Sequence, residues 1–262
     1  MREKIKKGLL TIVAVFIFAT SYYLIDRFSF EKEFPYYEVI VNNKDFFSIG
    51  VIGDSWVARK KLDTLLHEGL LEKGINNKII SSGQPSARSK LIYQNMFKDS
   101  TNKYSSKFLI KKHPDYCIVI AGVNDAIGQI GANFYSHHMI LIIKNLLYYN
   151  IKPVIVELPE FGIVEHINNK NTFNRMRYII SSKFNNKGEI DNIKTYRKNL
   201  NKLLMEEKLN DKIIFIDFDN ICSNYEDCKD IFKKDGAHLN EEGNKLLSEN
   251  IVNVLTKQIL MR

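Results

Sequence analysis

The stretch FSIGVIGDSW at residues 47–56 carries the first information about the fold. Its first part, Phe47–Ile52, has the length and the β-branched content of a buried strand. Asp54 and Ser55 follow within three residues, and a helical pattern begins near Trp56. A strand that leads through a short polar turn into a helix is typical of α/β proteins, whose ligand sites lie beyond the carboxyl ends of parallel strands.

On the C-terminal side of this stretch, further apolar runs of strand length alternate with segments of helical periodicity. Because these runs are almost continuously hydrophobic, we expect parallel strands that are covered on both faces. The pattern predicts one α/β domain with a five-stranded parallel sheet, and a long Asn-rich loop or lid from Pro159 to Asp191. The predicted strands are Phe47–Ile52, Lys78–Ser81, Tyr116–Ala121, Pro153–Leu158 and Ile213–Asp217, and the predicted helices include Leu62–Glu72, Met139–Tyr149, Tyr196–Leu209 and Glu241–Leu260.

The N-terminus carries an uncharged stretch from Gly8 to Ile25, preceded by four cations and followed by Asp26 and Arg27. These 18 residues would form a helix of about 27 Å, close to the roughly 30 Å of a bilayer's hydrocarbon core. We expect a transmembrane signal-anchor with its cations in the cytoplasm and the rest of the chain outside. The alternative is a cleaved signal peptide, for which residues 19–21 offer small side chains, and both interpretations export the folded domain. The four cations are Arg2, Lys4, Lys6 and Lys7.

The composition of the 262 residues is that of a folded protein, with 45% hydrophobic and 26% charged residues. The formal charge of +8 admits polyanionic partners. Beyond the N-terminus, however, the lysines are dispersed among Asp and Glu rather than massed in a block. We therefore expect no nucleic-acid binding.

The chain has three cysteines, in two different settings. Cys222 and Cys228 lie close together in a polar loop, where export would permit a disulfide, although the sequence leaves their pairing open. Cys117 lies in the apolar run of the third predicted strand, and we expect it to be a buried thiol.

Two predicted strands end in polar turns that could carry chemistry. Ser55 stands where the first strand becomes a helix, a position exposed to substrate, although a serine there is also a common helix cap. Asn124 and Asp125 follow the third strand, where an Asn amide could donate to an oxyanion, or both residues could form a turn and cap the next helix.

A third polar motif precedes the last predicted helix and contains Asp235 and His238. An Asp three residues before a His can accept the Nδ1 proton, which leaves Nε2 free to take a proton from a serine. A solvated surface His is the alternative for such a pair alone. Because a serine nucleophile needs a base, the combination with Ser55 favours a catalytic interpretation.

Three motifs together resemble the conserved blocks of the SGNH, or GDSL-type, hydrolases. They match blocks one, three and five of that family in order and in wide separation, and they span nearly all of the predicted domain. Gly83, after the second strand, is the candidate for the glycine of block two. The three motifs are Gly53-Asp54-Ser55, Gly122-Val123-Asn124-Asp125 and Asp235-Gly236-Ala237-His238-Leu239-Asn240.

This resemblance implies a flavodoxin-like, three-layer α/β/α sandwich and an acyl-enzyme mechanism. Ser55 would be the nucleophile, His238 the base and Asp235 its orienting carboxylate, with Asp54 holding the turn. The backbone N–H groups of Ser55 and Gly83 and the amide of Asn124 would form the oxyanion hole. Neither a metal nor an organic cofactor is required by this chemistry. The domain plan is a tip and anchor at 1–26, a linker at 27–44 and an SGNH hydrolase domain at 45–262.

Export, a membrane tether and the family's habits favour an esterase that removes O-acetyl or other short acyl groups from a cell-envelope or capsular polysaccharide. A polysaccharide O-acetyltransferase with the same triad is the nearest alternative, and a lipase or thioesterase is another. A non-catalytic glycan-binding or assembly protein is an alternative from a different class.

The remaining histidines and arginines are not assigned to the site. We interpret the adjacent His137 and His138 as helix surface rather than as metal ligands, because neighbouring positions face different directions. His67, His113 and His166 have no partner that spacing identifies. Arg88, Arg175 and Arg177 are interpreted as solvated surface side chains, with contact to an anionic substrate as the alternative.

Overall fold

The computed structural model describes residues 2–39, 41, 45–59 and 61–261. Its contacts divide the chain into two compact units, Met1–Lys32 and Glu33–Arg262. The N-terminal unit contains α1 (Arg2–Phe28), and its segment Leu10–Phe28 is long and apolar enough to cross a membrane. None of that segment is buried, so its apolar side chains are not those of a protein core helix.

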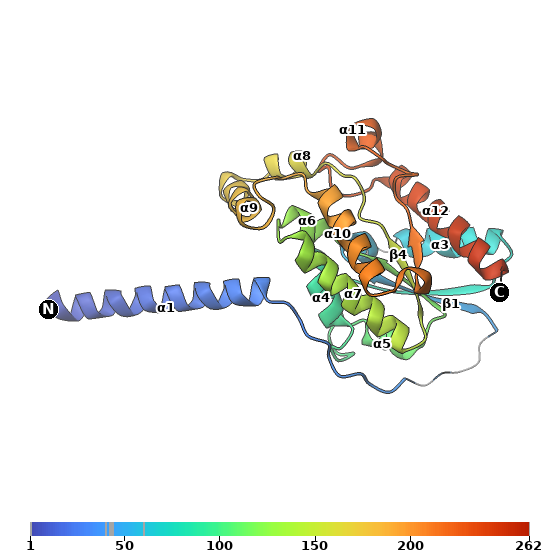
Figure 1. Ribbon diagram of the computed structural model, residues 1–262, viewed down its shortest axis with the longest axis horizontal. Helices are drawn as coiled ribbons and strands as arrows, with labels where there is room; N and C mark the ends of the chain where they lie inside the picture. Colours follow the sequence, from blue (N-terminus) through green and yellow to red (C-terminus); the bar gives the residue numbers. More distant parts are fainter. Residues whose placement is uncertain (1, 40, 42–44, 60, 262) are drawn as a thin grey trace. The chain divides into compact units, whose positions relative to one another are not determined.

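A five-stranded parallel sheet forms the centre of the second unit, which confirms the predicted sheet (Figure 1). Its strands lie in the order β2-β1-β3-β4-β5, and each begins and ends within two residues of its predicted range. All five residues of β3 are buried, as expected for a strand covered on both faces. The strands are β1 (Phe47–Gly53), β2 (Asn77–Gly83), β3 (Tyr116–Ile120), β4 (Lys152–Val156) and β5 (Ile214–Ile216).

Helices cover both faces of this sheet, giving the three-layer α/β/α architecture that the sequence predicted. One layer contains α3 (Lys61–Glu72) and α12 (Glu241–Leu260), and the other contains α4 (Ser89–Asn95), α7 (Ala132–Tyr148) and α10 (Ile193–Glu206) (Figure 1). The other α-helices of this unit are α2 (Ser55–Ala58), α5 (Lys107–Lys111), α6 (Val123–Ile127), α8 (Ile163–Asn168), α9 (Thr172–Asn185) and α11 (Tyr225–Cys228).

α7 differs most from its prediction, because it begins at Ala132 rather than at Met139. It packs against both α4 and α10 and is buried over most of its circumference, so its first turns show no single apolar face. The interpretation of both adjacent histidines as helix surface is wrong for His138. Its side chain is fully buried, and its Nδ1 donates to the carbonyl oxygen of Phe134 at 2.7 Å.

The strand order predicts a ligand crevice at the carboxyl ends of β1 and β3. β1 lies between β2 and β3, so the connection from β1 runs outward to β2 and the next one returns past β1 to β3. In open parallel sheets, ligands bind beyond the carboxyl ends of the strands at such a reversal. Ser55 follows β1 and Asn124 follows β3, so both residues belong to this crevice.

Part of the predicted linker packs on the second unit. The backbone N–H of Phe34 donates to the hydroxyl of Tyr93, and that of Tyr37 donates to the hydroxyl of Tyr149, each at 2.8 Å. Aromatic stacking adds to these contacts. This part of the predicted linker forms neither helix nor strand, and it is fixed against α4 and the end of α7. Residues 42–44, at the end of the predicted linker, lie outside the described residues.

The cysteines and the predicted lid have definite structures. Cys222 and Cys228 form a disulfide just before and within α11, and Cys117 is a buried free thiol, as predicted. The segment predicted as a loop or lid contains α8 and α9 and is mostly helical.

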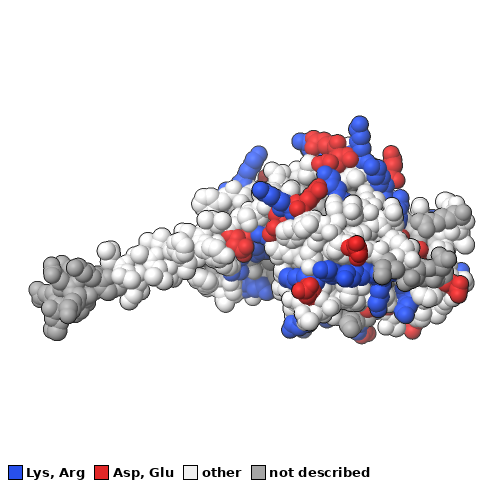
Figure 2. Space-filling view, turned by 90° about the horizontal axis from the view of Figure 1, so that it is seen from below, with Lys and Arg blue, Asp and Glu red and all other residues white. Residues whose placement is uncertain are grey.

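On the face of the second unit shown in Figure 2, Lys and Arg are interspersed with Asp and Glu rather than gathered into one basic patch.

Gly53 offers a test of how closely β3 and α2 approach the end of β1. A Cβ atom at this position would lie 2.4 Å from the backbone carbonyl oxygen of Ile120 and 2.7 Å from a methyl group of Val57. We expect Gly53→Ala to lower the free energy of unfolding by about 1–3 kcal/mol or more, because a backbone atom cannot move aside cheaply. Gly69→Ala is the matched control, since its Cβ would meet only the Val252 side chain and alanine favours the α3 helix. Denaturant unfolding of the full chain measures both changes, and equal stabilities of the two variants would contradict this interpretation.

Candidate active site

The turn after β1 holds Ser55 at the start of α2 without using its side chain as a cap. Asp54 is the residue that caps this helix, because its carboxylate accepts the backbone N–H of Trp56 at 3.0 Å. The alternative role of Ser55 as a helix cap is therefore wrong, and the structural role expected for Asp54 is confirmed. With the cap supplied by its neighbour, the Ser55 hydroxyl can point towards the crevice.

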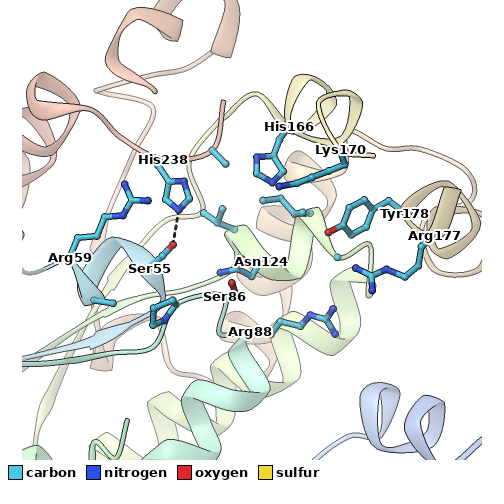
Figure 3. A pocket seen from close by; sticks show the side chains of 16 residues that line it. Ser55, Arg59, Ser86, Arg88, Asn124, His166, Lys170, Arg177, Tyr178 and His238 are labelled. Atoms are coloured by element: carbon cyan, nitrogen blue, oxygen red, sulfur yellow. Dashed lines mark hydrogen bonds between the residues drawn. The ribbon is translucent and has the colours of Figure 1, made fainter. Parts of the chain in front are cut away.

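Ser55, His238 and Asp235 form a continuous hydrogen-bonded chain. The Ser55 Oγ lies 3.0 Å from Nε2 of His238, and Nδ1 of the same ring lies 2.5 Å from Oδ2 of Asp235 (Figure 3). A carboxylate only accepts hydrogen bonds, so Nδ1 carries the ring proton and Nε2 accepts the serine hydroxyl. This is the protonation pattern that a serine nucleophile and its base require.

Asp235 is held in its ionised form. Partial burial alone would raise its pKa, but hydrogen bonds from the His238 ring and from the backbone N–H groups of His238 and Ala237 outweigh that effect. The net result is a pKa of about 2. The carboxylate therefore stays negative at any pH near neutrality and favours the imidazolium that forms when His238 takes a proton.

Two aromatic side chains fix the loop that carries the base. The indole N–H of Trp56 donates to the carbonyl oxygen of Ala237 at 3.1 Å, and Nδ1 of His166 donates to the carbonyl oxygen of Asp235 at 2.8 Å. Burial lowers the pKa of His166, which keeps this ring neutral. Spacing gave no signal for His166, because its partner lies 69 residues away in the sequence.

The same loop makes a close backbone contact that only glycine allows. The Gly162 N–H donates to the Gly236 carbonyl oxygen at 2.8 Å, and Gly236 has a φ of +69°. A Cβ on Gly236 would lie 2.9 Å from the carbonyl oxygen of Gly162. The start of α8 and the loop before α12 therefore meet backbone to backbone beside His238.

Asn124 lies in the same crevice, and its amide is connected to the serine turn. Nδ2 donates to Oδ2 of Asp54 at 3.2 Å and to the carbonyl oxygen of Ala87 at 3.0 Å. Both amide hydrogens thus have protein acceptors, and donation to an oxyanion, which stays a prediction, requires that one of them be shared with substrate. Asp125 does not cap α6 but α4, by accepting the backbone N–H and the hydroxyl of Ser89.

The carboxyl of Asp54 is fully buried, and it lies between Ser55 and Asn124. Burial raises its pKa and the nearby Asp125 adds to this effect, whereas hydrogen bonds from Trp56 and Asn124 oppose it, and the net result is a pKa of about 7. Its protonation near neutral pH therefore changes the charge that faces the amide of Asn124.

Gly83 lies at the end of β2, directly opposite Gly53 in the sheet register. A Cβ here would lie 2.3 Å from the backbone nitrogen of Ala58, so α2 packs closely against this glycine. Gly83 is not among the described residues that line the cavity. Its predicted N–H donation to an oxyanion stays a prediction.

Ser55, Asn124 and His238 line a single cavity of about 600 Å³. The wall beyond Asn124 and His238 comes from the predicted lid, through residues of α8, of α9 and of the turn between them (Figure 3). No sequence motif identifies these residues, and Arg88 and Arg177, which were interpreted as solvated surface, line the cavity, whereas Arg175 does not. The cationic lining residues are Arg59, Arg88, Lys170 and Arg177.

Carboxylates also gather at the ends of β4 and β5, where an arginine lies among them. Oxygen atoms of Glu157, Asp217 and Asp219 lie within 4.8 Å of one another. Arg197 lies 2.5 Å from Asp219 and 3.8 Å from Glu157, so this α10 side chain supplies positive charge to the group. Burial raises the pKa of Glu157 to about 7 despite the arginine. We interpret the group as an ion-pair network that fixes α10 to the strand ends.

Replacing Trp56 tests the anchoring of the base. We expect Trp56→Phe to lower kcat by about 10- to 100-fold with little change in KM, because His238 loses a fixed position relative to Ser55. Phe218→Leu is the control, since Phe218 packs near Trp56 but holds no part of the loop. Steady-state kinetics on a soluble ester measures both variants, and equal losses of kcat would show that packing rather than the hydrogen bond matters.

The buried Asp54 predicts a pH dependence of stability. Its folded pKa of about 7 exceeds the ordinary value of 3.8, so between these values the folded state holds a proton that the unfolded state has released. The contribution of Asp54 to the free energy of unfolding is therefore largest below about pH 4, and it is lost as the pH rises towards 7. We expect Asp54→Asn to gain stability relative to the wild type over that interval. Denaturant unfolding at pH 4, 5.5, 7 and 8 measures the difference, and parallel pH profiles would contradict the burial effect.

Comparison with known proteins is consistent with this geometry. The sequence model of the GDSL-like lipase/acylhydrolase family matches residues 42–251. The fold is similar to that of a lipase/acylhydrolase from Enterococcus faecalis, with 16% identity, 81% of this chain and 97% of that chain covered, and a TM-score of 0.59. It is also similar to the esterase EstA from Pseudoalteromonas sp., with 12% identity, 81% and 98% coverage and a TM-score of 0.56.

A GDSL-like lipase from Bacteroides thetaiotaomicron has the same fold, with 14% identity, 80% and 88% coverage and a TM-score of 0.52. No curated protein matches the sequence significantly. The family match extends over most of the chain and includes Ser55, Asn124 and His238. The chain is therefore a member of the GDSL-like lipase/acylhydrolase family, whose fold is that of the SGNH hydrolases.

Proposed function

We propose that the chain is a membrane-anchored serine esterase that removes O-acetyl or other short acyl groups from a cell-envelope or capsular polysaccharide outside the cytoplasm. The observation that carries the proposal is the hydrogen-bonded chain from Ser55 through His238 to Asp235. Membership of an acylhydrolase family supports the reaction type. The apolar helix and the cations before it support the location, and the location in turn favours a glycan substrate.

In the first half of the reaction, Ser55 Oγ attacks the ester carbonyl carbon while its proton passes to Nε2 of His238. The negative charge that develops on the carbonyl oxygen is stabilised by the N–H groups of Ser55 and Gly83 and by the Asn124 amide. The C–O bond to the sugar then breaks, and His238 returns its proton to the leaving oxygen. The products are a free hydroxyl on the sugar and an acyl group bound to Ser55.

In the second half, His238 takes a proton from water, and the resulting hydroxide attacks the acyl carbonyl. Collapse of this intermediate releases the carboxylic acid and restores the Ser55 hydroxyl with the proton held by His238. If a sugar hydroxyl replaces water in this half-reaction, the same residues perform acyl transfer instead of hydrolysis.

Product analysis separates these outcomes. The full chain in neutral detergent is incubated with an O-acetylated polysaccharide, and free acetate is measured. We expect the wild type to release one acetate for each acetyl group that the polysaccharide loses, over many turnovers. Ser55→Ala should release none above background. Acetate that appears instead on an added acceptor glycan would show a transferase, and absence of both products from a panel of acetylated glycans would contradict the proposed substrate class.

Removal of the Asn124 amide tests the oxyanion hole. We expect Asn124→Ala to lower kcat by about 10²- to 10³-fold with a smaller effect on KM, since the donor acts where charge develops. Asn253→Ala on the exposed surface of α12 is the control and should keep the wild-type rate. A loss of kcat below tenfold in Asn124→Ala would show that the amide serves only its contacts with Asp54 and Ala87.

A further inference from the structure

The charged side chains that line the active-site cavity all have the same sign. Among the described residues that line it are four cationic side chains, and none of the lining residues is an Asp or a Glu. Elsewhere on the same unit, cations and acids alternate, as Figure 2 shows for one face. A cavity lined by charges of a single sign concentrates ligands of the opposite sign.

These cations are not distributed evenly around the catalytic serine. Arg88, Lys170 and Arg177 lie on one side of Ser55, whereas Arg59 lies on the other side (Figure 3). Arg88 precedes α4, Lys170 lies in the turn after α8, and Arg177 belongs to α9. Two parts of the chain that are distant in the sequence, the residue before α4 and the stretch from α8 to α9, therefore direct cations to the same side of the cavity.

Lys170 and Arg177 have no carboxylate partner within the described parts of the chain. By contrast, Lys144 and Arg197 form ion pairs with nearby acids. Arg88 is engaged with its surroundings, since its guanidinium packs beside Gly128 and its charge lowers the pKa of Asp125. On this side of Ser55, Lys170 and Arg177 are thus the two cations most available to a ligand, and the guanidinium of Arg177 lies 5.2 Å from the centroid of the Tyr178 ring.

Hydrogen-bonding groups accompany these two cations. The side chains of Ser86 and Tyr178 line the same part of the cavity, and Tyr178 follows Arg177 on α9. A guanidinium and an ammonium with neighbouring hydroxyls form a suitable set of donors for a carboxylate or a phosphate.

We propose that Lys170 and Arg177 bind an anionic group of the substrate, a carboxylate or a phosphate of the acylated sugar, so that the enzyme prefers acidic glycan esters to neutral ones. This inference rests on the proposed esterase function and narrows its substrate class. The anionic group lies on the part of the substrate that extends from Ser55 towards α9. The acyl group itself stays at the serine, and the reaction is unchanged.

The test compares three acetylated methyl glycosides that differ only in the group at C6. This group is a neutral alcohol in the first, a carboxylate in the second and a phosphate ester in the third. The full chain in neutral detergent hydrolyses each, and acetate release gives kcat and KM. We expect kcat/KM of the wild type to be about 10- to 100-fold higher for at least one acidic ester than for the neutral ester, as charge-assisted hydrogen bonds would provide. The two acidic substrates distinguish carboxylate from phosphate recognition.

The double variant Lys170→Gln/Arg177→Gln should lose this preference, mainly through a higher KM for the acidic ester, so that its kcat/KM values for the acidic and the neutral ester agree within about twofold. Arg175→Gln removes an exposed arginine of α9 that does not line the cavity, and it should keep the preference. Added salt should weaken the preference of the wild type more than that of the double variant.

Two results would overturn the inference while leaving the esterase function intact. One is equal kcat/KM of the wild type on all three esters. The other is a preference for acidic esters that survives in the double variant. Failure to hydrolyse any of the three esters, or equal rates with Ser55→Ala, would instead count against the proposed function itself.

Discussion

The position of one imidazole ring determines what this molecule can do. His238 is useful as a base only if its Nδ1 is protonated and its Nε2 faces Ser55, and the carboxylate of Asp235 imposes both conditions. The loop that carries these two residues is fixed in turn by donors from Trp56, His166 and Gly162. One of these donors, Trp56, is the residue directly after Ser55, so the serine turn and the loop of His238 are positioned by each other.

A second constraint is the closeness of backbones around the serine turn. Gly53 and Gly83 lie opposite each other in the sheet. A methyl group on Gly53 would overlap the backbone of Ile120 in β3, and one on Gly83 would overlap the backbone of α2. The buried carboxyl of Asp54 then caps α2 and accepts the amide of Asn124. The carboxyl ends of β1 and β3 are thereby joined through one buried acid, so that Ser55 and Asn124 share a single rigid support.

Local sequence was sufficient to predict the sheet, because its strands are covered on both faces and appear as apolar runs between turn residues. It also predicted the pairing of Asp235 with His238, whose spacing is short. It did not predict the start of α7, which has no single apolar face, or the burial of His138. Nor did it identify His166, Lys170 or Arg59 as cavity residues, because only the packing of distant segments brings them to the site. The oxyanion roles of Gly83 and Asn124 still rest on family resemblance.

The claim on which the account depends is that Ser55 is a nucleophile activated by His238. Reaction of the full chain with a fluorophosphonate, followed by peptide mass spectrometry, tests it most directly. The account predicts one phosphonyl adduct per chain, located on Ser55, and a labelling rate that falls by orders of magnitude when His238 is replaced by Ala. An adduct on another residue, or labelling of Ser55 at an unchanged rate without the imidazole, would contradict it.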